Sequence, residues 1–185
     1  MDASTIFPLH FPAGTDMIDI GSDGKAEITM RGMRRLNRKT TYARAREILD
    51  QADYGVLSTT CEDGLPYGIP LSFALSGNSI YFHAAVEGQK LDNLAHDSRV
   101  CLTAVCRAET HPAAFTVAYQ SAMAFGTARI VYGEDERRAG LRLLCRKYCP
   151  ELPAAKIDAY LEAAITHTLV LRMDVEYISG KENPG

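Results

Sequence analysis

The stretch Tyr81–Leu94, YFHAAVEGQKLDNL, is the segment that decides the fold class of this chain, because it joins a short strand to a helix. Its first residues alternate between apolar and polar side chains, as in a strand. Leu91 and Leu94 are spaced as on one face of a helix. Gly88 and Lys90 lie where the two patterns meet. A connection of this kind is suited to holding a phosphate group.

Three physical properties of this connection favour an anionic ligand. Gly88 allows the backbone to approach a ligand closely, and the first turn of the helix offers unpaired N–H groups. Lys90 adds a positive charge at the same place. The same residues also occur at ordinary strand-to-helix turns with a solvated lysine, so this pattern alone leaves both interpretations open.

Further blocks of sequence extend the pattern over residues 30 to 183. In chain order they are Met33–Arg35, Tyr54–Ser58, Gly64–Phe73, Tyr119–Gly126, Arg146–Tyr148 and Gly180–Glu182. Together with Tyr81–Leu94 they resemble the pyridoxamine 5'-phosphate oxidase-like split barrels, and in particular the 5-nitroimidazole-resistance (Nim) family. The resemblance implies one FMN-binding split-barrel domain over residues 30–185, preceded by an N-terminal extension over residues 1–29.

The order of the expected elements agrees with a mainly β fold with peripheral helices, an antiparallel split β-barrel of Greek-key type. Strands come in runs with helices inserted between them, whereas a βαβ fold would alternate them. The glycine-rich motifs of Rossmann and P-loop domains are absent from the sequence. We therefore expect neither of those nucleotide-binding folds.

The periodicity predicts the individual elements. A helix starts at Thr40 or Thr41, and Gly126 is expected to bend a long strand or to separate two strands. Pro70 cannot donate to a sheet, which indicates a bulge or a sheet edge. The other expected elements are strands at Tyr54–Cys61, Tyr67–Leu75, Ser79–His83, Val100–Cys106 and Thr168–Val175, helices at Gly88–His96, Asp135–Cys149 and Pro153–Ala164, a polar connection at Arg107–Pro112, and one or two strands over Phe115–Tyr132.

The resemblance also implies a set of cofactor-binding residues. The FMN phosphate would lie against Gly88 and Lys90, where Gln89 replaces an arginine found in larger relatives. This replacement is expected to weaken phosphate binding or to require an arginine from elsewhere. Ser121 would lie near the flavin, although an exposed strand hydroxyl is an equally simple interpretation. The flavin ring would contact the backbone of Ile69, Pro70, Leu71, Ser72, His83, Ala84 and Ala85.

His83 is the expected catalytic residue, because its place in the Nim-like pattern is beside the flavin and imidazole exchanges protons near neutral pH. The alternative is a hydrogen-bonded histidine at a strand end. The leading hypothesis is an FMN-dependent oxidoreductase that reduces a small, flat, electron-poor substrate, such as a nitroaromatic or a quinone, with electrons from NAD(P)H. A non-catalytic flavin carrier and a haem protein with His83 as axial ligand are alternatives. A vitamin B6 phosphate oxidase is disfavoured because the family's C-terminal Arg–His segment is lacking.

The composition is that of one ordinary domain, with 185 residues, 46% hydrophobic and 23% charged. A net charge of -3 gives no general attraction to nucleic acid or to an anionic membrane. The sequence contains neither a span of about 20 apolar residues nor a signal peptide, which favours the cytoplasm. By resemblance, a homodimer with flavin sites at its interface is expected.

Two local clusters have a simpler and a more specific interpretation. The basic residues between Arg31 and Lys39 form either a solvated face or an arm that reaches an anionic ligand or an acidic partner. The five cysteines have no disulfide framework. Cys145 and Cys149 are four apart, as two metal ligands on one helix face could be. Without further ligands nearby they are better explained by packing, and no metal site is expected.

Overall fold

The computed structural model describes residues 17–18 and 30–185, which belong to two compact units, Met1–Asn37 and Arg38–Gly185. In the first unit, β1 (Met17–Ile18) pairs antiparallel with β2 (Met30–Arg31). A short 3₁₀ turn, η1 (Leu36–Arg38), follows. The predicted N-terminal extension over residues 1–29 otherwise lies outside the described residues.

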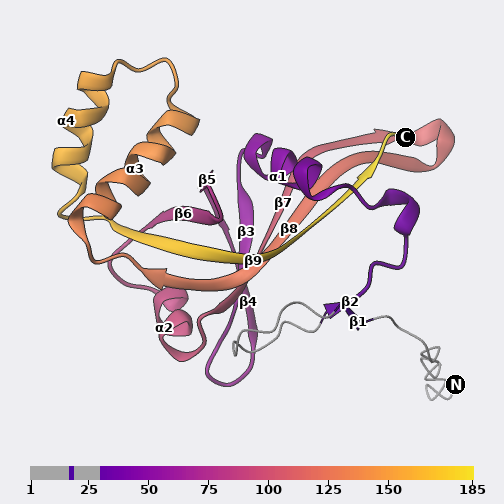
Figure 1. Cartoon of the computed structure of the whole chain (residues 1–185), viewed down its shortest axis with the longest axis horizontal. Helices are drawn as coiled ribbons and strands as arrows, with labels where there is room; N and C mark the ends of the chain where they lie inside the picture. The colour runs from indigo at the N-terminus through magenta and orange to yellow at the C-terminus, as the bar shows by residue number, and fades with distance from the viewer. Residues whose placement is uncertain (1–16, 19–29) are drawn as a thin grey trace, which may run out of the picture. The chain divides into compact units, whose positions relative to one another are not determined.

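The second unit is built on one antiparallel sheet of seven strands, in the order β4-β3-β7-β8-β9-β6-β5 (Figure 1). The two edge strands, β4 and β5, are separated in sequence by Ser72 alone. The sheet must therefore curl until its two edges meet at this residue, which makes a split barrel and confirms the predicted fold class. The strands are β3 (Gly55–Thr60), β4 (Pro66–Leu71), β5 (Phe73–Ser76), β6 (Ser79–Ala84), β7 (Arg99–His111), β8 (Thr116–Ile130) and β9 (Leu169–Asn183).

Four α-helices surround the sheet in the described part of the chain. α1 (Tyr42–Gln51) begins at Thr41, whose side chain accepts a hydrogen bond from the backbone N–H of Arg44 at 3.2 Å. α2 (Gln89–His96) follows β6 directly. α3 (Glu134–Tyr148) and α4 (Ala154–Ala164) connect the end of β8 to the start of β9 and form a hairpin at one side of the barrel (Figure 1).

Two clusters of buried side chains hold the sheet and the helices together. The larger fills the barrel and includes Phe73 and Phe82, both fully buried. The smaller, which includes Leu144, Ile157 and Val170, packs α3 and α4 against the sheet. This second cluster lies on the outer side of the barrel sheet, and it packs the helix hairpin beside β6.

Three segments differ from the sequence predictions. The predicted strand Tyr67–Leu75 is two strands, β4 and β5, because the chain leaves one sheet edge and joins the other. The predicted polar connection Arg107–Pro112 is mostly strand, since β7 pairs with β8 as far as His111, where a short 3₁₀ turn, η2 (Pro112–Ala114), begins. The closing strand is also longer than predicted, because β9 runs on to Asn183.

Gly126 marks the bend in β8, which is one continuous strand. The register between β8 and β9 shifts beside this residue, from Phe125 opposite Tyr177 to Gly126 opposite Val175. A Cβ atom at Gly126 would collide with the backbone carbonyl of Asp174 and lie 3.2 Å from the backbone nitrogen of Glu176. The close approach of β9 therefore requires glycine here, and the predicted bend is confirmed.

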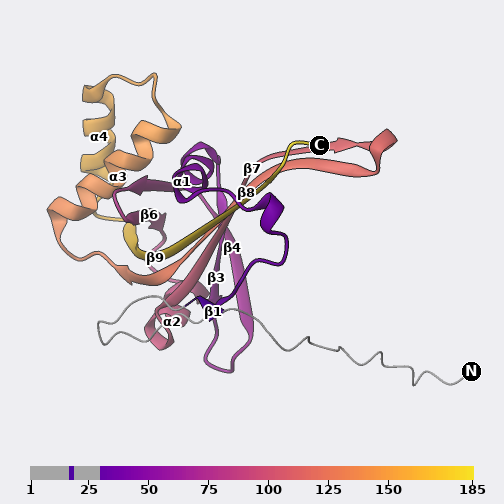
Figure 2. The ribbon, with the colours of Figure 1, turned by 45° about the vertical axis from the view of Figure 1, so that its right-hand side comes forward.

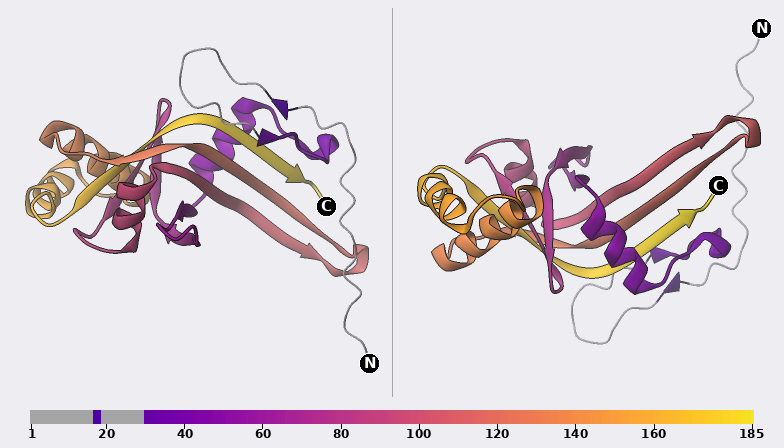
Figure 3. Two further views of the ribbon diagram at one scale, coloured as in Figure 1. Left: turned by 90° about the horizontal axis from the view of Figure 1, so that it is seen from below. Right: turned by 90° about the horizontal axis from the view of Figure 1, so that it is seen from above.

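Beyond the bend, β7 and β8 continue as a ribbon that projects from the barrel (Figures 2 and 3). Its tip carries Phe115, which is 98% exposed and has a φ of 48°. Pro70 lies on β4, an edge strand, as its missing N–H predicts.

Candidate functional site

The connection between β6 and α2 has an unusual backbone conformation at Gly88 and a helix start without a side-chain cap. Gly88 has a φ of 128°, which side chains other than glycine rarely adopt. No side chain caps the start of α2, although the N–H of Leu91 donates to the carbonyl of Gly88 at 2.8 Å. The Lys90 ammonium lies 3.9 Å from the position that a Gly88 Cβ would occupy. The Lys90 ammonium therefore lies near Gly88 at the start of the helix.

A buried amide fixes α2 to the barrel. Asn93 is 1% exposed and donates through Nδ2 to the hydroxyl of Thr59 on β3 at 2.8 Å. Its oxygen accepts a hydrogen bond from the side chain of Gln89, also at 2.8 Å. Gln89, which replaces the arginine expected of larger relatives, therefore serves the orientation of the helix through Asn93. The start of α2 is positioned by these contacts.

The break between β4 and β5 is closed by a tyrosine from α3. The backbone N–H of Phe73 donates to the Tyr148 hydroxyl at 2.9 Å, and that hydroxyl donates to the Phe73 carbonyl at 3.0 Å. Burial raises the pKa of Tyr148, and the hydrogen bond to Phe73 opposes this shift. Tyr148 replaces the strand partner that the sheet edge lacks, and it holds α3 next to Ser72.

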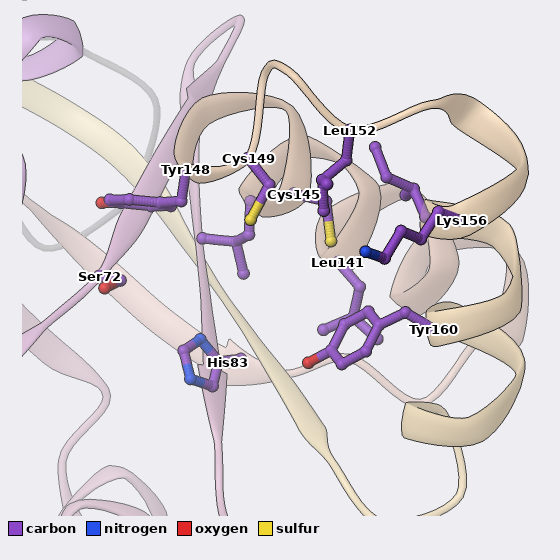
Figure 4. A pocket seen from close by; sticks show the side chains of 11 residues that line it. Ser72, His83, Leu141, Cys145, Tyr148, Cys149, Leu152, Lys156 and Tyr160 are labelled. Atoms are coloured by element: carbon purple, nitrogen blue, oxygen red, sulfur yellow. The ribbon is translucent and has the colours of Figure 1, made fainter.

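A pocket of about 380 Å³ opens between this break, β6 and the helix hairpin (Figure 4). His83 and Ser72 lie along the wall formed by the barrel, and Tyr148 lies next to Ser72. The opposite wall is largely apolar and comes from α3, α4 and the turn between them. The pocket-lining residues that come from α3, α4 and the turn between them are Leu141, Leu144, Cys145, Tyr148, Cys149, Leu152, Lys156, Ile157 and Tyr160.

The structure brings some of the predicted site residues together and separates others. His83 and Ser72 share the pocket, whereas Gly88 and Lys90 lie at the start of α2 and do not line it. Pro70 and Ala85 are exposed, Ile69 and Leu71 pack partly against the barrel core, and Ala84 is 5% exposed. Of the residues predicted to contact the flavin ring, only Ser72 and His83 line this pocket.

Ser121 lies on β8 opposite Val105 and Lys181, and it donates to the Lys181 carbonyl at 3.3 Å. It belongs to the outward face of the sheet, which it shares with Val105 and Met123. Ser121 is therefore separate from the His83 pocket within one chain.

Sequence reasoning missed Tyr148, Lys156 and Tyr160 as pocket residues. Lys156 and Tyr160 are four apart, so their shared helix face was visible in the sequence. Nothing in the sequence showed that α4 would turn this face toward His83. Cys145 and Cys149 line the same pocket, and burial raises the pKa of the Cys145 thiol, with the nearby Cys149 adding to the shift. Among the described residues, no group of three or more His, Cys, Asp or Glu side chains is arranged to hold a metal ion.

Two members of the basic segment contact the barrel: Lys39 forms an isolated β-bridge with Lys181, and Arg38 lies against Tyr119. The guanidinium of Arg38 lies 5.9 Å from the centre of the Tyr119 ring, and Lys181 lies 5.7 Å from it. Burial alone would raise the pKa of Tyr119, but hydrogen bonds with Arg38 and Lys181 lower it overall. Arg34 and Arg35 are exposed.

These features define a split-barrel protein with a pocket at the seam of its barrel. The family profile described as pyridoxamine 5'-phosphate oxidase matches residues 41–182, and the chain belongs to this family. The superfamily resemblance in the sequence is thereby confirmed. No curated protein sequence matches the chain. None of the helices in residues 17–18 and 30–185 is long and apolar enough to cross a membrane.

Solved structures share the fold. A candidate 5-nitroimidazole antibiotic resistance protein from Bacteroides thetaiotaomicron is 24% identical with a TM-score of 0.65, over 76% of this chain and 83% of that one. A FAD and heme binding protein from Mycobacterium smegmatis is 21% identical with a TM-score of 0.65, over 80% and 74%. A flavocytochrome from Azotobacter vinelandii is 20% identical with a TM-score of 0.63, over 83% and 73%.

Proposed function

We propose that the protein binds FMN and uses it to reduce a small, flat, electron-poor substrate. The observation that supports the proposal is the start of α2, which has no side-chain cap and where the Lys90 ammonium lies near Gly88, because unpaired N–H groups and a positive charge suit a phosphate. The relatives named for FAD and heme binding and for 5-nitroimidazole resistance support the flavin and the class of substrate. Fold does not fix chemistry, so the family description alone assigns no activity.

The residues present fit such a cofactor. Its phosphate would be held by Gly88 and Lys90, and its ring would lie beside the backbone of Ile69–Ser72 and His83–Ala85, where β4 is an unpaired edge. When bound, FMN supplies the capacity to accept electrons from a nicotinamide and to pass them to an acceptor. The side chains of this chain bind, orient and exchange protons.

His83 is placed to serve the substrate side of this reaction. Its side chain is exposed on β6 and lines the pocket together with Ser72 (Figure 4). An imidazole here can give a proton to an oxygen or nitrogen atom of a substrate as that atom gains electrons. Replacing His83 with glutamine should leave flavin binding intact and reduce turnover, and unchanged turnover would make His83 a structural residue.

A homodimer is part of the proposal, with each flavin site completed by the second subunit. The outward face of β3, β7 and β8 carries exposed apolar side chains, with Val56 39%, Val105 52% and Met123 38% exposed. Val56 lies opposite Thr103, which in turn lies opposite Met123, so these residues form one row across the sheet. Ser121 is on the same face and could reach the flavin of a second copy. We expect Val105→Glu to yield monomers with weakened flavin binding in analytical ultracentrifugation and flavin titration.

Haem binding is the second candidate, because two of the similar structures are named for heme or as a flavocytochrome. His83, exposed in the pocket, would then be the axial ligand. The visible spectrum of the purified protein separates the two. A flavin spectrum with released FMN supports the main proposal, a Soret band supports haem, and a protein that binds neither would overturn both.

Lys90 provides the direct test of the flavin site. Lys90→Ala should weaken FMN binding roughly tenfold, because a charge-assisted hydrogen bond to phosphate is lost. Lys90→Arg keeps the charge and serves as the matched control, with binding followed by flavin fluorescence quenching. Equal affinity in the wild type and Lys90→Ala would remove this residue from the site.

For the compartment we propose the cytoplasm, in agreement with five free cysteines.

A further inference from the structure

Two polar groups across the pocket from His83 have no role in the proposed flavin binding. Lys156 and Tyr160 lie one helical turn apart on α4, and Figure 4 shows the ammonium and the hydroxyl directed into the cavity. Within the part of the chain that the structure describes, neither side chain has a hydrogen bond or an ion pair. Both groups are therefore available to a ligand.

The charges around the pocket leave Lys156 without a counter-ion. Nearby carboxylates on α4 are paired with arginines of α3, with Asp158 bound to Arg142 at 2.5 Å and Glu162 bound to Arg138 at 2.5 Å. No carboxylate is among the residues that line the pocket. An anion entering from solvent would find one ammonium group and no carboxylate among the residues that line the pocket.

The rest of the pocket wall is suited to an apolar ring. Leu141, Leu144 and Ile157 line it and are buried, and Leu152 and Tyr160, which also line it, are 37% and 55% exposed. Covering large solvent-exposed apolar side chains with a ligand is favourable, because it removes their surface from water. A cavity of about 380 Å³ has room for a ligand of one or two rings.

We propose that this pocket binds flat aromatic carboxylates. The carboxylate would pair with Lys156 and Tyr160, and the ring would lie among the leucines. The opposite end of the ligand would then face His83 and Ser72. This inference rests on the proposed function in one respect, that the ligand bound here is the electron acceptor, and it narrows the acceptor to aromatic anions.

The test compares two probes of equal shape, para-nitrobenzoate and its neutral amide, para-nitrobenzamide, by calorimetry at neutral pH. The carboxylate should bind roughly tenfold more tightly than the amide, because it gains a charge-assisted contact. Lys156→Gln should abolish this preference and Lys156→Arg should keep it. Arg146→Gln removes an exposed charge from α3 that does not line the pocket, and should also keep it. Equal binding of both probes, or a preference that survives in Lys156→Gln, would overturn the inference.

The thiols of the pocket give a second measurement that does not depend on activity. Saturating para-nitrobenzoate should slow alkylation of Cys145 and Cys149 by iodoacetamide and leave Cys61, which is outside the pocket, unaffected. Mass spectrometry of the cysteine-containing peptides measures the extent of alkylation at each cysteine. Unslowed alkylation of both pocket cysteines while the probe is bound would place the probe elsewhere and refute the assignment.

The two proposals fail in different ways. A protein that binds no flavin but still selects the carboxylate through Lys156 would contradict the proposed function and keep this inference. A protein that binds FMN tightly but shows no Lys156-dependent preference would keep the proposed function and overturn this inference.

Discussion

Replacement of Asn93 by alanine should destabilise the protein by about 2 kcal/mol. The buried amide donates to Thr59 at 2.8 Å, and a hydrogen bond of this kind contributes about 1 kcal/mol. The substitution also leaves a small cavity between α2 and β3, which adds a similar amount. Gln89 is exposed and can bond to water instead, so its lost contact costs little. In a chain of this size the loss corresponds to a fall in melting temperature of roughly 4–8 °C.

Urea unfolding of four proteins measures this effect: the wild type, Asn93→Ala, Thr59→Val and the double variant. Thr59→Val preserves shape and removes the partner hydroxyl, so the double-mutant cycle should give a coupling energy of about 1 kcal/mol between the two side chains. A loss below about 0.5 kcal/mol in Asn93→Ala, or additive effects in the double variant, would refute the argument that this amide fixes α2.

Two further predictions concern other anchoring contacts. Hydrogen bonds from the Arg99 side chain and backbone lower the pKa of Asp97 to about 2. The Asp97 carboxylate therefore stabilises the fold fully at pH values above the ordinary pKa of an aspartate, near 4, and this stabilisation is lost as the pH falls toward about 2. Asp97→Asn should therefore cost roughly 1 kcal/mol at neutral pH, after allowance for solvent screening, and almost nothing near pH 2 in urea unfolding; a cost independent of pH would contradict this. Tyr148→Phe should cost about 2 kcal/mol and speed hydrogen exchange of the Phe73 amide, since it removes both bonds at the break between β4 and β5. Unchanged exchange at Phe73 would show that water replaces the hydroxyl.

The barrel could be predicted from the sequence wherever one face of a strand is buried. β6 and the first half of β9 show clear alternation, and the turns around them have recognisable glycines. The far half of β9 was missed because the bulge at Glu176 shifts the pattern by one residue. Leu171 and Met173 are buried before the bulge, and Ile178 and Gly180 are buried after it. A period-two pattern ends at such a shift, although the strand continues.

The outer ribbon was missed for a different reason. The segment Arg107–Thr110 is exposed on both faces, so its residues show no alternation, and only their pairing with β8 makes them a strand. For the site, His83 and Ser72 could be placed from local sequence and resemblance. The wall formed by Lys156 and Tyr160 could not, because it depends on how a helix hairpin distant in sequence packs against β6.

The position of β9 has a consequence for how the chain reaches its native state. This strand is the last of the sheet along the chain, and it lies between β8 and β6. Without it the sheet consists of two separate pieces, β4-β3-β7-β8 and β6-β5. Nascent chains must therefore keep the apolar faces of both pieces uncovered until residues 169–183 have been synthesised. Barrel closure is thus a late, long-range step, and it depends on a strand that contributes no residue to the pocket wall.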